Sequence, residues 1–185
     1  MNKELSLEKA LGMTPQEKKD LVERIAQDAC DFEKKCRGCC QVVVAAIQNN
    51  LKIGSIELYK AASAMGAGVA GNGEICGALL AGILCIGVIY GRDSKEKLTT
   101  YSEKYQDARD RAGSLSDKYR AEFGSLRCCD VLEKLHGRLF NLRKSEDREA
   151  FSVPEIHDKC AFITCKKAAQ MAAEVLLEVG GPNDY

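Results

Sequence analysis

The sequence has no net charge, few histidines and no recognisable hydrolytic motif, and each of these shortages excludes a class of function. Its 27 basic side chains are balanced by 27 acidic ones, so the surplus of Lys and Arg that phosphate binding needs is missing and no nucleic-acid partner is expected. Only two histidines are present, which leaves little capacity for general-base catalysis. Neither a Ser-His-Asp set nor a paired-carboxylate site is recognisable.

Segments that would direct the chain to a membrane are also missing. The longest apolar stretch, ICGALLAGILCIGVIY at 75–90, has 16 residues and includes three glycines, which is short for a transmembrane helix, so no membrane partner is expected. Residues 1–11 contain no apolar signal-peptide core, so we expect a cytoplasmic protein. Thiols stay reduced in that compartment, where an excess of cysteine indicates metal binding or redox chemistry more than structural disulfides.

Cysteine is the residue that the chain has in excess, with ten among 185 residues. Cys30 and Cys85 lie within helical patterns and are expected to be small buried hydrophobic residues. Most of the cysteines fall into groups near the ends of different predicted helices. That arrangement suits an iron–sulfur cluster or another thiolate-bound metal whose ligands are gathered by the fold. The groups are Cys36, Cys39 and Cys40; Cys76 with Cys85; Cys128 and Cys129; and Cys160 with Cys165.

The spacing of apolar residues predicts an all-α fold, a compact bundle of about six to seven helices around a central Gly-rich apolar helix. At this length, with 45% apolar residues, one domain spanning 1–185 is expected. Residues 1–35 would form an N-terminal helical extension and 36–179 the cysteine-bearing part. Helices are predicted over 15–35, 39–50, 56–65, 75–90, 129–136 and 158–179, with a further one that is capped by Asp93 or Ser94 and ended by Gly124.

A glycine-rich loop precedes Cys76, which stands at the start of the apolar helix. Free backbone N–H groups and the helix dipole stabilise a thiolate there, which makes Cys76 a good ligand or nucleophile. Glu74 is a candidate cap for the same helix. The loop also contains GAGVAG at 66–71, but a dinucleotide-binding fingerprint needs a preceding strand, and the Ala-rich segment before this loop is predicted to be helical.

Two other groupings have plainer explanations. Cys36 and Cys39 form a CxxC, but a thioredoxin-like dithiol follows a strand, whereas a helix is predicted here. His157 is a possible partner of Cys160 in a metal site, although an exposed loop histidine is the commoner case.

Four short segments follow the order of a known cysteine pattern. Residues 38–43 (GCCQVV), 71–78 (GNGEICGA) and 123–128 (FGSLRC) resemble its N-C-A-Q-A-V, Gly-rich C-G-A and F-G-S-x-x-C segments. The fourth is placed on Cys165 because alanines and Glu174 follow it at the expected helical offsets. One departure is Ala81, where the pattern has glycine. From about residue 36 to about residue 178, the chain therefore resembles the redox-active family named for the pattern C_GCAxxG_C_C.

The resemblance implies an iron–sulfur cluster held by Cys39, Cys76, Cys128 and Cys165. It places Gly71, Gly73 and Gly77 beside the cluster and makes Cys160 the alternative fourth ligand. Such a site would exchange electrons with a redox partner protein or a small-molecule electron acceptor, and an open iron would make it a small reductive enzyme. The secondary candidate ligands are Cys36, Cys40, Cys129 and Cys160.

Two other functions stay open at this point. One is a metal-free thiol–disulfide protein in which Cys39 or Cys76 attacks and a neighbouring cysteine resolves. The other is a metal-binding or helix-pairing protein that uses the apolar stripe from Leu98 to Phe123, with Tyr105 and Tyr119 in it, as a dimer seam. A homodimer is compatible with all three functions because symmetric dimers are the commonest oligomers.

Overall fold

The protein is described by a computed structural model over residues 6–93 and 102–179. Within these ranges all regular structure is helical, apart from one isolated bridge between Ile75 and Arg127, so the predicted all-α class is confirmed. A 3-10 turn, η1 (Ala62–Met65), continues α4, and a π-helical segment, η2 (Ala161–Cys165), joins α9 to α10. The helices are α1 (Leu7–Leu11), α2 (Pro15–Cys36), α3 (Cys39–Leu51), α4 (Ile56–Ala61), α5 (Gly77–Tyr90), α6 (Glu103–Phe123), α7 (Cys128–His136), α8 (Ser145–Phe151), α9 (Pro154–Cys160) and α10 (Lys166–Leu176).

Local signals set several helix boundaries as predicted. Helix α2 begins with a capping box, in which the Thr14 hydroxyl accepts from the N–H of Glu17 at 3.3 Å and the Glu17 carboxylate accepts from the N–H of Thr14 at 2.9 Å. Helices α6 and α7 end at Gly124 and Gly137, whose φ values of 83° and 70° are left-handed. Glycine adopts this conformation without the steric penalty of a Cβ.

Helix α6 begins later than predicted. Its N-cap is Ser102, whose hydroxyl accepts from a first-turn N–H at 3.2 Å. The predicted cap at Asp93 or Ser94 is therefore wrong for this helix, because the free N–H groups of the first turn are served by a closer serine. Ser94, Leu98 and Tyr101 lie outside the described residues. The single last helix predicted over 158–179 is instead formed by α9, η2 and α10, of which α9 begins earlier, at Pro154, and α10 ends earlier, at Leu176.

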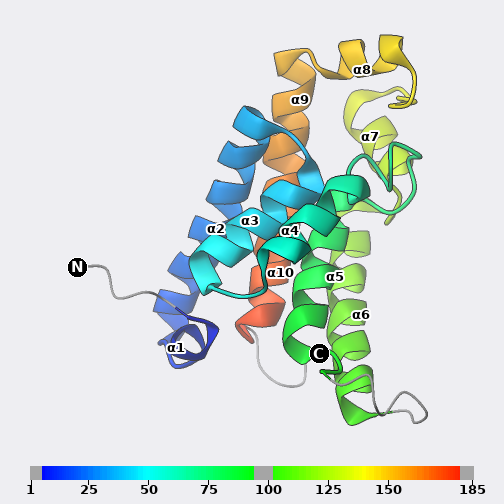
Figure 1. The fold of residues 1–185 in the computed structure, drawn as a ribbon. Helices are drawn as coiled ribbons and strands as arrows, with labels where there is room; N and C mark the ends of the chain where they lie inside the picture. Colours follow the sequence, from blue (N-terminus) through cyan, green and yellow to red (C-terminus); the bar gives the residue numbers. More distant parts are fainter. Residues whose placement is uncertain (1–5, 94–101, 180–185) are drawn as a thin grey trace.

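Helix α10 lies in the middle of the bundle, where it packs against α2, α3, α5 and α6 (Figure 1). Its buried alanines at 168, 169, 172 and 173 let these neighbours approach closely. The Gly-rich helix α5 packs against α3, α6 and α10. A Cβ on Gly82 would stand 2.7 Å from Leu115 Cδ2 and 2.8 Å from Ala172 Cβ, so this contact with α6 and α10 requires glycine.

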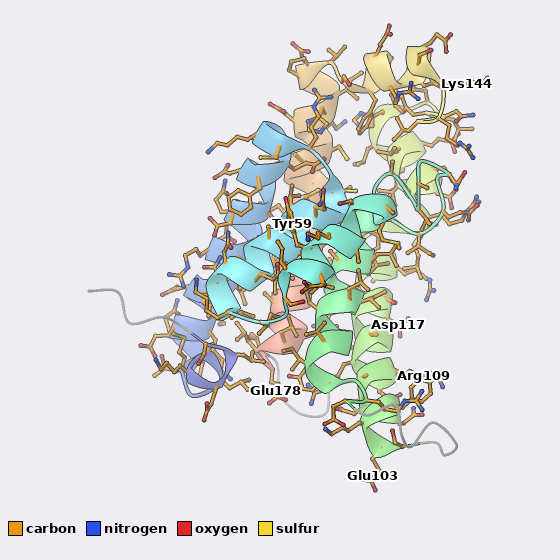
Figure 2. The ribbon with its side chains drawn as sticks, viewed as in Figure 1. Tyr59, Glu103, Arg109, Asp117, Lys144 and Glu178 are labelled. Atoms are coloured by element: carbon orange, nitrogen blue, oxygen red, sulfur yellow. The ribbon has the colours of Figure 1, made fainter. Side chains whose placement is uncertain are left out.

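The apolar stripe of α6 faces the chain's own core. Leu115, Tyr119 and Phe123 are buried against the helices packed on α6, namely α5 and α10. The opposite, polar face carries residues such as Asp117, whose side chain is 77% exposed (Figure 2). Because these apolar side chains are already covered within one chain, the prediction that this part of the stripe forms a dimer seam is wrong.

The described part of the N-terminal extension belongs to the same core as the rest of the chain. Leu21, Val22 and Ile25 of α2 are buried together with residues of α3 and α10. A smaller apolar cluster, which includes Cys128, Leu132 and Phe140, connects α7 to the segment of α8 and α9 at one end of the molecule (Figure 1). Among the described helices, none combines the length and the apolar character that a membrane span requires.

Candidate functional site

A cavity of about 490 Å³ lies where the end of α2, the start of α3 and the glycine-rich loop meet α7, α8 and α9. Four cysteines line it: Cys39, Cys76, Cys128 and Cys160. The fold therefore brings together one cysteine from each of the four groups. Gly71 of the loop, one of the predicted cofactor-binding glycines, also lines this cavity.

Three of these cysteines stand at helix N-termini. Cys39 is the first residue of α3, Cys76 is the N-cap of α5 and Cys128 is the first residue of α7. None of the three helices has a side chain that caps its first turn. Their dipoles therefore place partial positive charge beside sulfur, which stabilises negative charge in the cavity.

The glycine-rich loop has an unusual backbone. Five consecutive residues, 67–71, have φ between 54° and 79°, and Ala67, Val69 and Ala70 among them are not glycine. Left-handed φ is costly for residues with a Cβ, above all for β-branched valine, and such strain is typical of functional sites. The loop carries the backbone N–H of Ala67 to the Cys39 thiol, to which it donates a hydrogen bond.

Backbone hydrogen bonds tie this loop to the start of α7. The N–H of Cys76 donates to Leu126 O at 2.9 Å, and the N–H of Cys128 donates to Glu74 O at 2.6 Å. Cys76 and Cys128 are thereby held side by side. The Glu74 carboxylate does not cap α5, contrary to the prediction, but lies 3.5 Å from Nε of Arg127.

The two other predicted glycines permit close approach. A Cβ on Gly77 would stand 2.6 Å from Cys39 Sγ and 2.8 Å from Met65 O. One on Gly73 would stand 3.1 Å from Cys129 Cβ, and Gly73 also has a left-handed φ of 73°. Because they lack a Cβ, both glycines let the backbone pack closely against cysteine residues.

The fourth position differs between the sequence prediction and the cavity. Cys160 lines the cavity, whereas Cys165 is fully buried outside the lining. Thr164 connects them, with its hydroxyl 3.2 Å from Cys160 Sγ and 4.0 Å from Cys165 Sγ. The π-helical η2 between the two cysteines rotates residues away from simple α-helical offsets, and such bulges are frequent at functional sites.

The remaining cysteines stand away from the cavity lining. Cys36 is exposed, and Cys40 is fully buried in the main core. The Cys129 thiol is half-buried and lies 3.3 Å from Asp130 Oδ1. Cys30 and Cys85 are fully buried, which confirms the prediction that they act as small hydrophobic residues. All ten thiols are free.

Burial sets the protonation of three cavity thiols, Cys39, Cys128 and Cys160. It raises the pKa of Cys160 to about 12, and it holds the pKa of Cys39 well above its usual range, an effect to which the neighbouring Cys76 adds. Burial likewise raises the pKa of Cys128. These thiols are therefore neutral at physiological pH unless a bound cation replaces their protons.

Two kinds of metal site make different demands on the thiols around the cavity. Within residues 6–93 and 102–179, no three His, Cys, Asp or Glu side chains converge closely enough to hold one metal ion. A four-iron cluster makes a different demand, since each of its four thiolates binds a separate iron. Four thiols around one cavity fit that demand, and the volume of about 490 Å³ is typical of a cofactor site.

Sequence reasoning missed Glu33 and Tyr119 as site candidates and favoured an exposed loop position for His157. His157 is 3% exposed and lines the cavity, so the prediction of an exposed loop histidine is wrong. Its Nε2 lies 3.2 Å from Oε1 of Glu33, which is also buried in the cavity wall. The sequence did carry a signal that both residues are buried. Glu33 continues the four-residue spacing of the buried Ile25 and Ala29, and His157 lies four residues before the buried Ala161.

Tyr119 is the third such residue. It is fully buried, and its hydroxyl, beside the Cys76 thiol, lacks a hydrogen bond of acceptable geometry within the described chain. Burial above all, and then the nearby Cys76, raises the pKa of Tyr119, so the phenol stays protonated. A protonated phenol thus stands beside one of the cavity cysteines.

Comparison with known proteins and protein families places the chain in a family. No curated protein and no solved structure matches the chain. The pattern of one protein family matches residues 38–179, a range that includes all four cavity cysteines and His157 but not Glu33. The chain belongs to the family described as "Putative redox-active protein (C_GCAxxG_C_C)".

Proposed function

We propose that this protein is a redox protein whose cavity holds an iron–sulfur cluster through Cys39, Cys76, Cys128 and Cys160. The observation that carries the proposal is the convergence of three uncapped helix N-termini, each with a cysteine at its start, on one cavity. Thiolates and the clusters they bind are anionic, and helix N-termini stabilise anions. Membership of a redox-active family agrees with this assignment.

The chain's own residues would do three things at such a site. The four cysteines would bind the cluster. The left-handed loop at 67–71 directs the Ala67 N–H at Cys39 sulfur, a contact that makes a bound cluster easier to reduce. Val131, Leu132 and Phe151 line the same cavity and limit access of water. The cluster itself supplies one-electron storage and transfer.

Burial argues against Cys39 as the attacking thiol of the metal-free thiol–disulfide alternative. The thiolate is the attacking species in disulfide exchange, but burial holds the pKa of Cys39 far above physiological pH. The same burial leaves metal binding favourable, because a cation replaces the proton and compensates the thiolate charge in place.

Anaerobic purification of the full chain tests the proposal. We expect brown protein with visible absorbance and matched amounts of iron and acid-labile sulfide. Colourless protein without iron or sulfide would contradict the proposal. Thiol counts that change on mild oxidation of that colourless protein would instead support the dithiol function.

The fourth ligand can be identified with two matched variants. Cys160→Ser is expected to lower iron and sulfide content at least tenfold, because it removes a thiol from the cavity wall. Cys165→Ser, one helical turn further along, is expected to keep the bound iron. Iron analysis of both proteins, purified anaerobically side by side, decides between them, and retention only in Cys160→Ser would restore Cys165 as the ligand.

A further inference from the structure

The cavity has a polar wall beside its thiols. Glu33, from the last part of α2, and His157, from α9, meet there with 3.2 Å between Oε1 and Nε2. Their side chains are 7% and 4% exposed. The ring of Phe151 packs edge-on against the His157 ring, with 5.8 Å between centroids. The pair is therefore fixed in place and shielded from bulk water.

One oxygen of Glu33 has no partner. Its Oε2 is buried and accepts no hydrogen bond within the described chain, while Glu33 itself lines the cavity. Buried polar atoms in folded proteins nearly always have a partner, and an orphan indicates an absent ligand, water or proton. A simple structural tie between α2 and α9 needs only Oε1, so Oε2 is available for another role.

We propose that the Glu33–His157 pair is the proton-transfer site of this redox centre and takes up one proton when the cavity gains one electron. The electron comes from an external one-electron reductant and the proton from solvent, so the net charge of the buried site does not change. Oxidation of the site releases the electron and the proton, which suits small substrates that accept an electron and a proton together. This inference rests on the proposed function.

The physical reason is the cost of charge in a water-poor cavity. Coulomb interactions are much stronger there than in water, so an added electron favours proton uptake by any nearby base. Glu33 already interacts electrostatically with the sulfurs. Burial raises the pKa values of Cys39 and Cys165, and the Glu33 carboxylate adds to both rises. The interaction is mutual, so charge at sulfur acts equally on Glu33.

Other ionisable groups surround the pair. Asp158 lies on the far side of the imidazole, with Oδ1 3.7 Å from Nδ1, and its side chain is 50% exposed. The remaining groups come from each element around the cavity. They are Arg37 after α2, Cys39 of α3, Cys76 of α5, Cys128 of α7, Arg148 of α8, Cys160 of α9 and Cys165 of η2.

The test is the midpoint potential of the full-length, cluster-containing protein against pH, measured anaerobically with dithionite as reductant. Over about pH 5 to 8, where imidazoles ordinarily change charge, the potential is expected to fall as pH rises. The slope should approach about 59 mV per pH unit, which is the tenfold change in proton concentration converted for one electron. Iron and sulfide content are measured on every sample.

Two variants test whether the proton is taken up by the Glu33–His157 pair. His157→Gln is expected to remove the slope while keeping the cluster. Glu33→Gln is expected to change the slope or the pH range over which it appears, because it removes the carboxylate that faces the imidazole. Glu155→Gln, an exposed carboxylate on the same helix, is the control and should leave the profile unchanged.

The outcomes separate this inference from the proposed function. A coloured protein whose potential does not depend on pH overturns the inference alone. So does a slope that persists unchanged in both His157→Gln and Glu33→Gln. If His157→Gln binds no cluster, the pH profile of the midpoint potential in Glu33→Gln decides whether the pair takes up the proton. A wild-type protein without iron overturns the proposed function and this inference together.

Discussion

Cys76→Ser protein is expected to be purified without bound iron or sulfide, whereas Cys85→Ala protein keeps both. Cys76 lines the cavity and Cys85 is buried further along the same helix, in the core. Loss of one of four thiolate ligands removes the closed coordination that holds a cluster. Iron and sulfide analysis with visible absorbance, on proteins purified in parallel without oxygen, measures the difference.

The choice of serine separates ligand loss from unfolding. Cys76 is the N-cap of α5, and it makes no capping hydrogen bond. Serine is among the best N-cap residues, worth about 1 kcal/mol over residues that cannot cap. The variant should therefore keep its far-UV circular dichroism while losing its colour. Full iron content in Cys76→Ser would remove Cys76 from the ligand set.

Gly82→Ala is expected to reduce the free energy of unfolding by about 1–3 kcal/mol, the usual cost of forcing a methyl group into a packed core. The added Cβ would stand within 2.8 Å of both Leu115 Cδ2 and Ala172 Cβ, where α5 meets α6 and α10. Urea unfolding followed by circular dichroism gives the value.

Gly87→Ala is the matched control on the same helix. A Cβ at Gly87 meets nothing within 4 Å, so the helix gains about 0.5–1 kcal/mol from replacing glycine by alanine in its interior. Opposite signs for the two substitutions are expected. Equal effects would mean that α5 does not pack against α6 and α10 as described.

Much of the fold could be predicted from the sequence because the responsible forces are local. The capping box at Thr14 and the left-handed glycines at Gly124 and Gly137 act within a few residues, and they set boundaries that the structure confirms. The apolar spacing likewise identified α2, α3 and α5. The start of α6 was missed because Ser102 satisfies the same capping rule as Asp93 and Ser94, and the rule alone does not choose among them.

The candidate site was predictable only in part. The uneven grouping of the cysteines and the family resemblance indicated three residues, Cys39, Cys76 and Cys128, that line the cavity. Spacing could not choose between Cys160 and Cys165, because the π-helical turn between them changes which side chain faces inward. The non-glycine residues with left-handed φ in the loop gave no sequence signal at all.

By itself, the sequence determined that this chain forms helices, where several of them begin and end, and that it belongs to a redox-active family rich in cysteine. Tertiary structure alone decided that Glu33 and His157 meet, although they are separated by 124 positions along the chain. It also decided that three helix N-termini point at one cavity. Periodicity and capping act within a helix, whereas a site between helices depends on how their faces pack against one another.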